Sequence, residues 1–187
     1  GYAAKLRKTG QVAVAFCGEG TASQGDFHTA LNFAGVFATP SIFVIRNNGY
    51  AISTPESVQT AAESLAARGE GYGVPGYQVD GNDLPAVLHT MREAVARAKA
   101  GDGPTLIEAM TYRVGAHSTA DDPSAYRTDE ETAEWERLDP VARLARHGKW
   151  RGVWDDAREE AARAAWDARV TETLAQCEKH PPPPVES

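Results

Sequence analysis

Two short polar motifs in this sequence could together bind a metal ion and a diphosphate. Gly18-Glu19-Gly20-Thr21 follows an apolar run from Val12 to Cys17, and Arg46-Asn47-Asn48-Gly49-Tyr50 follows a second run from Ser41 to Ile45. A hard cation such as Mg²⁺ takes oxygen ligands, commonly a carboxylate and carbonyls together with phosphate oxygens. An acidic residue at one strand end and an amide pair at the next can supply such ligands.

Each motif alone is a weak signal. Gly-Glu-Gly is commonly only a tight turn from strand to helix, and Asn-Asn-Gly is commonly a surface turn with positive φ. Only 26 residues, 21–46, separate Gly20 from Asn47, and each motif directly follows an apolar strand. At this spacing the pair resembles the signature of thiamine-diphosphate enzymes, in which the acidic residue, the second Asn and a nearby backbone carbonyl bind Mg²⁺.

The apolar pattern around these motifs alternates between strands and helices. It predicts strands at residues 12–17, 41–45, 76–80 and 105–110, and helices at about 24–38, 61–68 and 83–100. The continuous apolar run of the first strand predicts that it is covered on both faces. The alternation predicts an α/β fold, a three-layer and mainly parallel sheet with right-handed crossovers. Ligands bind such sheets at the carboxyl ends of the strands, where both motifs lie.

A long polar loop, Val114–Thr128, carries a second cluster of candidate residues. His117 lies in it beyond the carboxyl end of a predicted strand, among Arg, Tyr and Asp side chains that could order the loop through charged hydrogen bonds. Loops of this length are commonly functional or disordered. A histidine here could donate to a phosphate or exchange a proton near neutral pH.

The two ends of the chain differ from its centre. Residues 1–8 predict the last turns of a helix that stops at Thr9-Gly10, so we expect a sheet that is incomplete at its N-terminal side and a chain that is part of a longer subunit. Helices are predicted at 129–137, 140–147 and 155–179, followed by a polyproline stretch at 181–184. We therefore divide the chain into residues 1–128, an α/β domain with the His117 loop, and residues 129–187, a helical extension.

Composition limits the function classes. A net charge of −7 argues against a nucleic-acid surface or an anionic membrane as the main partner. No apolar stretch reaches transmembrane length and no signal peptide opens the chain. Cys17 and Cys177 lie far apart and suggest neither a disulfide framework nor a zinc site. A soluble protein in a reducing compartment is the expectation.

Five segments in order extend the resemblance over essentially the whole chain. They are Gly18-Glu19-Gly20, Asp26-Phe27-His28 with Leu31-Asn32-Phe33-Ala34, Arg46 to Pro55, Val79-Asp80-Gly81-Asn82-Asp83 and His117-Ser118-Thr119-Ala120-Asp121-Asp122. The sequence resembles the α subunit of the thiamine-diphosphate-dependent 2-oxo acid dehydrogenases, the decarboxylating first component of multienzyme complexes. It is most similar to the branched-chain (3-methyl-2-oxobutanoate) form, while pyruvate and acetoin relatives share the skeleton.

The resemblance implies a role for each candidate residue. Glu19 and Asn48 would bind Mg²⁺ through side chains and Tyr50 through its backbone carbonyl. Gly20 and Thr21 would offer backbone groups to the diphosphate where a helix starts. Arg46 would pair with a phosphate oxygen, and His117 would reach the cofactor and assist acyl transfer to a lipoyl group. The family's common central Asp is Glu19 here, a change that branched-chain members also show.

The resemblance also implies partners. A β subunit would complete an α₂β₂ heterotetramer and supply the glutamate that activates the cofactor's aminopyrimidine ring, and a lipoyl-bearing acyltransferase would accept the acyl group of the 2-oxo acid substrate. We expect no nucleic acid or membrane partner. The expected location is the cytoplasm of a bacterium, or the mitochondrial matrix if the source is a eukaryote.

Three alternatives remain open from the sequence. A transketolase-like or acetolactate-type thiamine enzyme would share the metal motif, although the His117 loop argues against it. A Mg²⁺ and phosphate enzyme that does not use thiamine could have the same α/β scaffold. A catalytically inert interaction subunit is the non-enzyme alternative, which the joint presence of Glu19, Asn48 and His117 disfavours.

Overall fold

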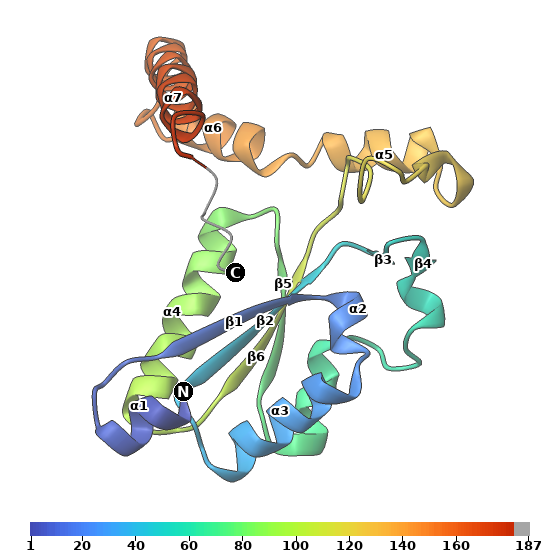
Figure 1. The fold of residues 1–187 in the computed structure, drawn as a ribbon, viewed down its shortest axis with the longest axis vertical. Coiled ribbons are helices and arrows are strands. Elements are labelled where there is room, and N and C mark those ends of the chain that lie inside the picture. Colours follow the sequence, from blue (N-terminus) through green and yellow to red (C-terminus); the bar gives the residue numbers. More distant parts are fainter. Residues whose placement is uncertain (182–187) are drawn as a thin grey trace. The chain divides into compact units, whose positions relative to one another are not determined.

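The computed structural model describes residues 1–181, which divide into two compact units, Gly1–Pro140 and the part from Val141 onward. The first unit contains a four-stranded parallel sheet (Figure 1). Its strands, in spatial order, are β1 (Ala13–Gly18), β2 (Ser41–Asn47), β6 (Thr105–Met110) and β5 (Gly76–Asp80). The α/β class and the mainly parallel sheet predicted from the sequence are confirmed.

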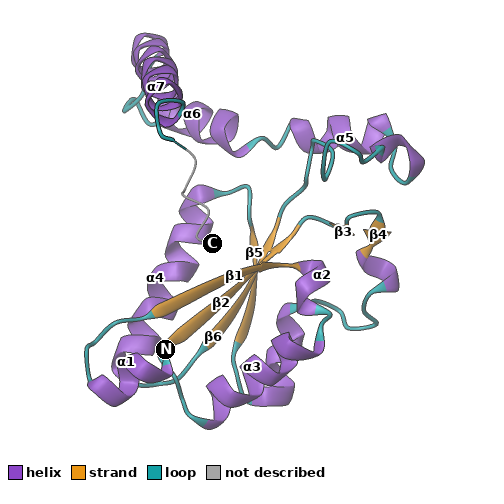
Figure 2. Ribbon diagram, in the orientation of Figure 1, coloured by secondary structure: helices purple, strands orange, loops and turns teal. Residues whose placement is uncertain are grey.

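Helices cover the two faces of this sheet (Figure 2). Helix α3 (Gly25–Val36) and the 3₁₀ helix η2 (Ala66–Tyr72) pack on one face, in a core that includes Leu31, Ile45 and Leu106. Helix α4 (Leu84–Ala100) covers the other, where Ala94 meets Ile42, Val44 and Ile107. Each β2 residue points to the face opposite its neighbour, which explains why a continuous apolar run is needed at the centre of the sheet.

The ends of α4 follow from local chemistry. The side chain of Asp83 accepts a hydrogen bond from the backbone N–H of Ala86 at 3.1 Å, and Gly101 ends the helix at φ 90°. A side chain that caps a free N–H and a left-handed glycine are the usual start and stop signals of helices, respectively. The helix predicted at about 83–100 is confirmed.

Two expectations about local structure were wrong. Strand β1 forms an edge of the sheet and is not covered on both faces, because α4 packs on its neighbours; Val14 and Phe16 are 41% and 66% exposed. The helix predicted at 61–68 is absent, and the 3₁₀ helix η2 begins only at Ala66. Side-chain acceptors compete for the backbone here, since the hydroxyl of Ser64 accepts from the N–H of Ala67.

The remaining elements of the first unit surround the carboxyl ends of the strands or flank the sheet. They are α1 (Tyr2–Arg7), α2 (Glu19–Ala22), the paired strands β3 (Tyr50–Ala51) and β4 (Thr54–Pro55), η1 (Glu56–Val58), η3 (Pro123–Ala125) and α5 (Asp129–Glu136). Helix α1 ends at Arg7, and its C-cap is Lys8, which takes φ 52°; the sequence analysis had predicted a stop at Thr9-Gly10. No helix among residues 1–181 is both long and apolar enough to cross a membrane.

The second unit consists of helices α6 (Pro140–Trp150) and α7 (Asp156–Cys177). Asp155 caps the start of α7, and Lys149 reaches Asp156 and Glu159 at 2.6 and 2.9 Å. Residues 129–140 group with the sheet here, whereas the sequence analysis assigned them to the helical extension; the division into domains at residue 128 stays a prediction. Most of the predicted polyproline stretch, 182–184, lies outside the described residues.

Candidate functional site

A cavity of about 810 Å³ opens at the carboxyl ends of β1 and β2. Its lining includes all seven residues to which the sequence analysis gave a role, namely Glu19, Gly20, Thr21, Arg46, Asn48, Tyr50 and His117. Parallel pairing places Gly18 opposite Arg46, so the two motifs meet at the same edge of the sheet. The structure thus brings the predicted residues together, while their individual roles stay predictions.

Glu19 is a buried carboxylate at the first strand end. It opens helix α2 directly after β1 and is only 2% exposed. Its Oε2 accepts a hydrogen bond from the backbone N–H of Asn48 at 3.3 Å, which joins the two motifs. Burial raises the pKa of the Glu19 carboxyl above its ordinary value. A buried charge is costly unless it is paired or binds a metal, so a cation beside Glu19 would remove this cost.

The Asn-Asn-Gly-Tyr turn is held by its own side chains. Asn47 Oδ1 accepts from the N–H of Gly49, and Asn48 Oδ1 accepts from the N–H of Tyr50, both at 3.1 Å. Gly49 has φ 85°, a conformation that side chains rarely adopt. The Tyr50 hydroxyl donates to Glu131 at 3.0 Å, so its backbone carbonyl rather than its ring is the group with which Tyr50 could bind a metal.

Helix α2 brings the chain very close to the small β3–β4 strand pair. A Cβ on Gly20 would lie 2.8 Å from the Cβ of Ala51, which explains the glycine at this position. The sequence analysis predicted a helix at about 24–38 and a helix start at Gly20 and Thr21; the structure has two helices, with a break at Ser23 and Gln24. Gly20 and Thr21 therefore lie in α2, a short helix that lines the cavity.

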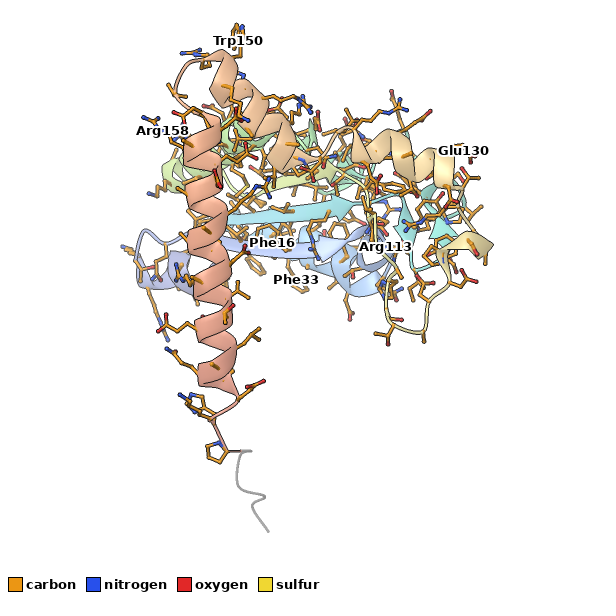
Figure 3. All side chains as sticks on the ribbon, turned by 90° about the horizontal axis from the view of Figure 1, so that it is seen from above. Phe16, Phe33, Arg113, Glu130, Trp150 and Arg158 are labelled. Carbon is orange, nitrogen blue, oxygen red and sulfur yellow. The ribbon has the colours of Figure 1, made fainter. Side chains whose placement is uncertain are left out.

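Arg113 is a cavity residue to which the sequence analysis gave no ligand-binding role. It follows strand β6 and lies on the side of the sheet toward which the strand arrows point (Figure 3). Its Nη2 donates to the carbonyl of Ile52 at 2.7 Å and to the Tyr126 hydroxyl at 2.9 Å. Its Nε and Nη1 are buried without a hydrogen-bond partner. Guanidinium nitrogens only donate, so these two groups lack an acceptor, and an anion in the cavity that Arg113 lines could provide one.

The position of Arg113 in the sequence could have suggested this role. It comes directly after the strand predicted at 105–110, at the same sheet edge as the two motifs. The sequence analysis did not single it out, because Arg113 stands in the sequence beside other charged and aromatic residues of the loop that follows.

The loop that carries His117 is ordered by hydrogen bonds. Asp121 Oδ2 accepts from the backbone N–H of His117 and from the Tyr126 hydroxyl, both at 2.7 Å. Arg127 donates to the backbone carbonyls of Arg113, Val114 and Gly115. The prediction that Arg, Tyr and Asp side chains order this loop is confirmed. The side chain of His117 itself makes none of these bonds, although the residue lines the cavity.

Replacing Asp121 with Ala should loosen this loop. The backbone N–H bond of His117 and the Tyr126 hydroxyl bond together hold the pKa of Asp121 below its ordinary value of 3.8. The Asp121 carboxylate therefore orders the loop at every pH above 3.8, and this contribution is lost only as the pH falls through the lowered pKa. We expect amide hydrogen exchange in residues 114–128 to become faster by about 10-fold or more in the Ala variant.

The matched control is Asp102→Ala, which removes an exposed carboxylate from the loop after α4. Both variants lose one negative charge, but only the first removes the acceptor of two loop hydrogen bonds. Equal exchange rates in the two variants at pH 7 would contradict the assigned contacts.

Metal binding at this cavity would have to rely on one carboxylate. Among residues 1–181, no group of three or more His, Cys, Asp or Glu side chains is placed to hold a metal ion. Glu19 with the Asn48 amide and the Tyr50 carbonyl therefore fits a hard cation whose remaining ligands are ligand oxygens and water. It does not fit a structural zinc site, which is closed by four Cys or His ligands.

Comparison with known proteins finds relatives that match most of this chain. The family described as "Dehydrogenase E1 component" matches residues 1–186. The 3-methyl-2-oxobutanoate dehydrogenase subunit alpha of Mycobacterium tuberculosis is 55% identical over 153 residues, which are 82% of this chain and 42% of that protein. The mitochondrial 2-oxoisovalerate dehydrogenase subunit alpha of Bos taurus is 49% identical over 179 residues, 95% of this chain and 39% of that protein.

Pyruvate relatives are about as similar. The pyruvate dehydrogenase E1 component subunit alpha of Staphylococcus aureus is 50% identical over 176 residues, 91% of this chain and 48% of that protein. The chain thus spans less than half the length of each of these relatives. The match to the family nevertheless extends over nearly the whole chain. As the resemblance in its motifs indicated, this chain belongs to the dehydrogenase E1 component family.

Proposed function

We propose that this chain holds the Mg²⁺–diphosphate end of thiamine diphosphate in the α subunit of a 2-oxo acid dehydrogenase. The complete enzyme would decarboxylate branched-chain 2-oxo acids and transfer the acyl group to the lipoyl group of an acyltransferase. One observation carries the proposal: a single cavity combines the buried carboxylate of Glu19 with Arg113, two of whose buried guanidinium nitrogens have no partner. The carboxylate of Glu19 suits a cation, and the guanidinium group of Arg113 suits an anion.

The residues fit the expected group on both counts. A Mg²⁺ ion would neutralise the carboxylate of Glu19, whose raised pKa reports its desolvation. Asn48 would add its amide oxygen and Tyr50 its carbonyl, each already oriented by the hydrogen bonds of the turn. A diphosphate would supply the acceptors that the Nε and Nη1 groups of Arg113 lack.

The other residues of the cavity would contribute in different ways. Gly20 and Thr21 lie in the first turn of α2, where backbone N–H groups have no acceptor within the helix. Arg46 is exposed at the end of β2 and would pair with a phosphate oxygen. His117 would reach toward the reacting end from the ordered loop and assist acyl transfer. When bound, thiamine diphosphate supplies the electron sink that decarboxylation of a 2-oxo acid requires.

Other parts of the enzyme would come from outside this chain. A β subunit in an α₂β₂ assembly would complete the cofactor site, and the acyltransferase would supply the lipoyl group. The complex would lie in a bacterial cytoplasm, or in the mitochondrial matrix of a eukaryote. These partners are proposed from the family and from the relatives' subunit names.

Substrate preference gives the proposal a direct test. We expect the complete enzyme, with the β subunit present, to prefer 3-methyl-2-oxobutanoate over pyruvate by at least about 10-fold in kcat/KM, since a pocket that buries one added methylene discriminates by 10-fold or more. The assay is CO₂ release from the two acids measured side by side. The relatives from Mycobacterium tuberculosis and Bos taurus support this order.

The pyruvate alternative rests on the relative from Staphylococcus aureus, which is 50% identical. A higher kcat/KM for pyruvate would replace the branched-chain assignment and leave the cofactor site intact. Absence of CO₂ release from any 2-oxo acid, together with absence of acetaldehyde release from acetoin, would instead favour an inert interaction subunit.

A further inference from the structure

The most deeply buried carboxylate of the sheet is not part of the cavity lining. Glu108, at the centre of strand β6, is fully buried. Each of its oxygens accepts hydrogen bonds: Oε1 from Asn47 Nδ2 at 2.7 Å, and Oε2 from the backbone N–H of Ala66 at 2.9 Å and from Gln78 Nε2 at 3.3 Å. One side chain thus joins β6 to β2, to β5 and to the start of η2.

Stability alone is a poor explanation for this group. Removing a charged side chain from water is costly, and replacing buried ionic groups with apolar residues of similar volume is often neutral or stabilising. The neighbouring inward positions are apolar, since Leu106 on the same strand and Ile45 opposite Glu108 belong to the core. A carboxylate at this position therefore calls for a role that an apolar side chain could not perform.

The contact with Asn47 provides such a role, because it fixes the direction of an amide. A carboxylate only accepts, so it requires Asn47 to turn its NH₂ group toward Glu108. The amide oxygen then faces the other way and accepts from the N–H of Gly49 at 3.1 Å. Asn47 is fully buried and has no freedom to find water instead. Its orientation sets the turn that follows.

That turn carries the two expected metal ligands of the second motif. Asn48 donates its backbone N–H to Glu19 at 3.3 Å, and its side-chain oxygen accepts from the N–H of Tyr50 at 3.1 Å. A hydrogen-bonded chain therefore runs from Glu108 through Asn47 to Gly49, at the centre of the turn. Partners behind metal ligands commonly affect metal affinity by 10–100-fold when they are changed.

We propose that Glu108 is a positioning residue for the Mg²⁺ site: it orients the Asn47 amide, and through it the turn that presents Asn48 and Tyr50. This inference rests on the proposed function. Glu108 touches neither the metal nor the cofactor, and its effect passes through the turn. Replacing Glu108 should therefore lower the Mg²⁺ affinity strongly, with more than a loss of Tm as its effect.

The first experiment compares Glu108→Gln with the wild type in the complete enzyme. The new amide keeps the size of the side chain and can still accept from Ala66, but its NH₂ group would then face the NH₂ group of Asn47. We expect the Mg²⁺ concentration for half-maximal binding of thiamine diphosphate, measured by calorimetry, to rise by about 10-fold or more. Glu93→Gln, on the exposed face of α4, is the matched control and should bind like the wild type.

A reciprocal exchange separates positioning from general damage. In the double variant Glu108→Gln/Asn47→Asp, the new amide at position 108 can donate to the new carboxylate at position 47. The second oxygen of that carboxylate can still accept from Gly49, and the total charge is that of the wild type. We expect the double variant to recover most of the lost Mg²⁺ affinity, which a merely structural role for Glu108 would not produce.

The outcomes are distinct. If the wild type itself shows no Mg²⁺-dependent binding of thiamine diphosphate, the proposed function fails. If the wild type binds and Glu108→Gln binds equally well, or loses only Tm, the positioning role is wrong. Should Glu108→Gln fail to assemble, Asn47→Ala leaves the contacts of Glu108 with Ala66 and Gln78 in place and must show the same loss of Mg²⁺ affinity; unchanged affinity there also overturns the inference.

Discussion

Replacing Glu19 with Gln is expected to abolish Mg²⁺-dependent binding of thiamine diphosphate and to raise the Tm of the cofactor-free enzyme. The amide oxygen can still accept from the N–H of Asn48, so the link between the two motifs survives. The negative charge that a cation needs is lost. We therefore expect the Mg²⁺ affinity to fall by more than about 100-fold, which exceeds the 10–100-fold effect of changing a residue that only supports a metal ligand. The buried carboxylate no longer has to be desolvated, which should raise Tm by a few °C.

The same carboxylate makes binding depend on pH. Mg²⁺ binds the charged form, and burial raises the pKa of Glu19 above its ordinary value of 4.5. Mg²⁺ affinity should therefore be complete above the raised pKa and decline as the pH falls through it, beginning at a higher pH than for an exposed glutamate. Calorimetry on the assembled enzyme from pH 8 to 5 measures this, with Glu93→Gln as the matched control. Wild-type affinity in Glu19→Gln would remove Glu19 from the metal site.

Replacing His117 with Gln is expected to reduce overall acyl transfer strongly while leaving cofactor binding nearly unchanged. The loop is held by the backbone N–H of His117 and not by its imidazole, so the substitution keeps the bond to Asp121. A positioned acid or base commonly contributes 10²–10⁴-fold to a rate. We therefore expect kcat for transfer to the lipoyl group to fall by about 100-fold or more, with the dissociation constant of thiamine diphosphate within about 3-fold of the wild type.

The readout is complex activity with a lipoyl acceptor, measured beside cofactor titration. His89→Gln, an exposed histidine on α4, is the matched control and should leave both quantities unchanged. A Gln variant at position 117 with normal transfer would show that the imidazole acts elsewhere. A large loss of cofactor affinity would instead assign His117 to binding.

Apolar patterning predicted the sheet strands and the α3 and α4 helices close to their observed bounds, and the sequence analysis also predicted helices over most of α5, α6 and α7. Apolar patterning failed where a contact distant in the sequence decides the backbone conformation. The segment at 61–68 has helical spacing, yet the N–H of Ala66 is taken by the buried carboxylate of Glu108, a long-range contact that no local pattern contains. The apolar composition of strand β1 predicted that both of its faces are covered, but coverage depends on which elements pack beside the strand.

The residues of the candidate site were predicted more fully than the residues that hold them in place. Glu19 and Asn48 could be recognised because strand ends of a parallel sheet converge on one edge. The free donors of Arg113 and the role of Asn47 depend on geometry across β1, β2 and β6, and they are visible only in the folded chain. Sequence motifs therefore located the proposed ligands, while the residues proposed to orient them could be found only in the structure.

One titration tests the central claim most directly: thiamine diphosphate added to the complete α and β enzyme with and without Mg²⁺. The claim is that this cavity holds a metal-bound diphosphate between Glu19 and Arg113. It predicts saturable binding in the presence of Mg²⁺, and binding weaker by about 100-fold or more when a chelator removes the metal. Binding of equal strength in both conditions, or no binding in either, would contradict it.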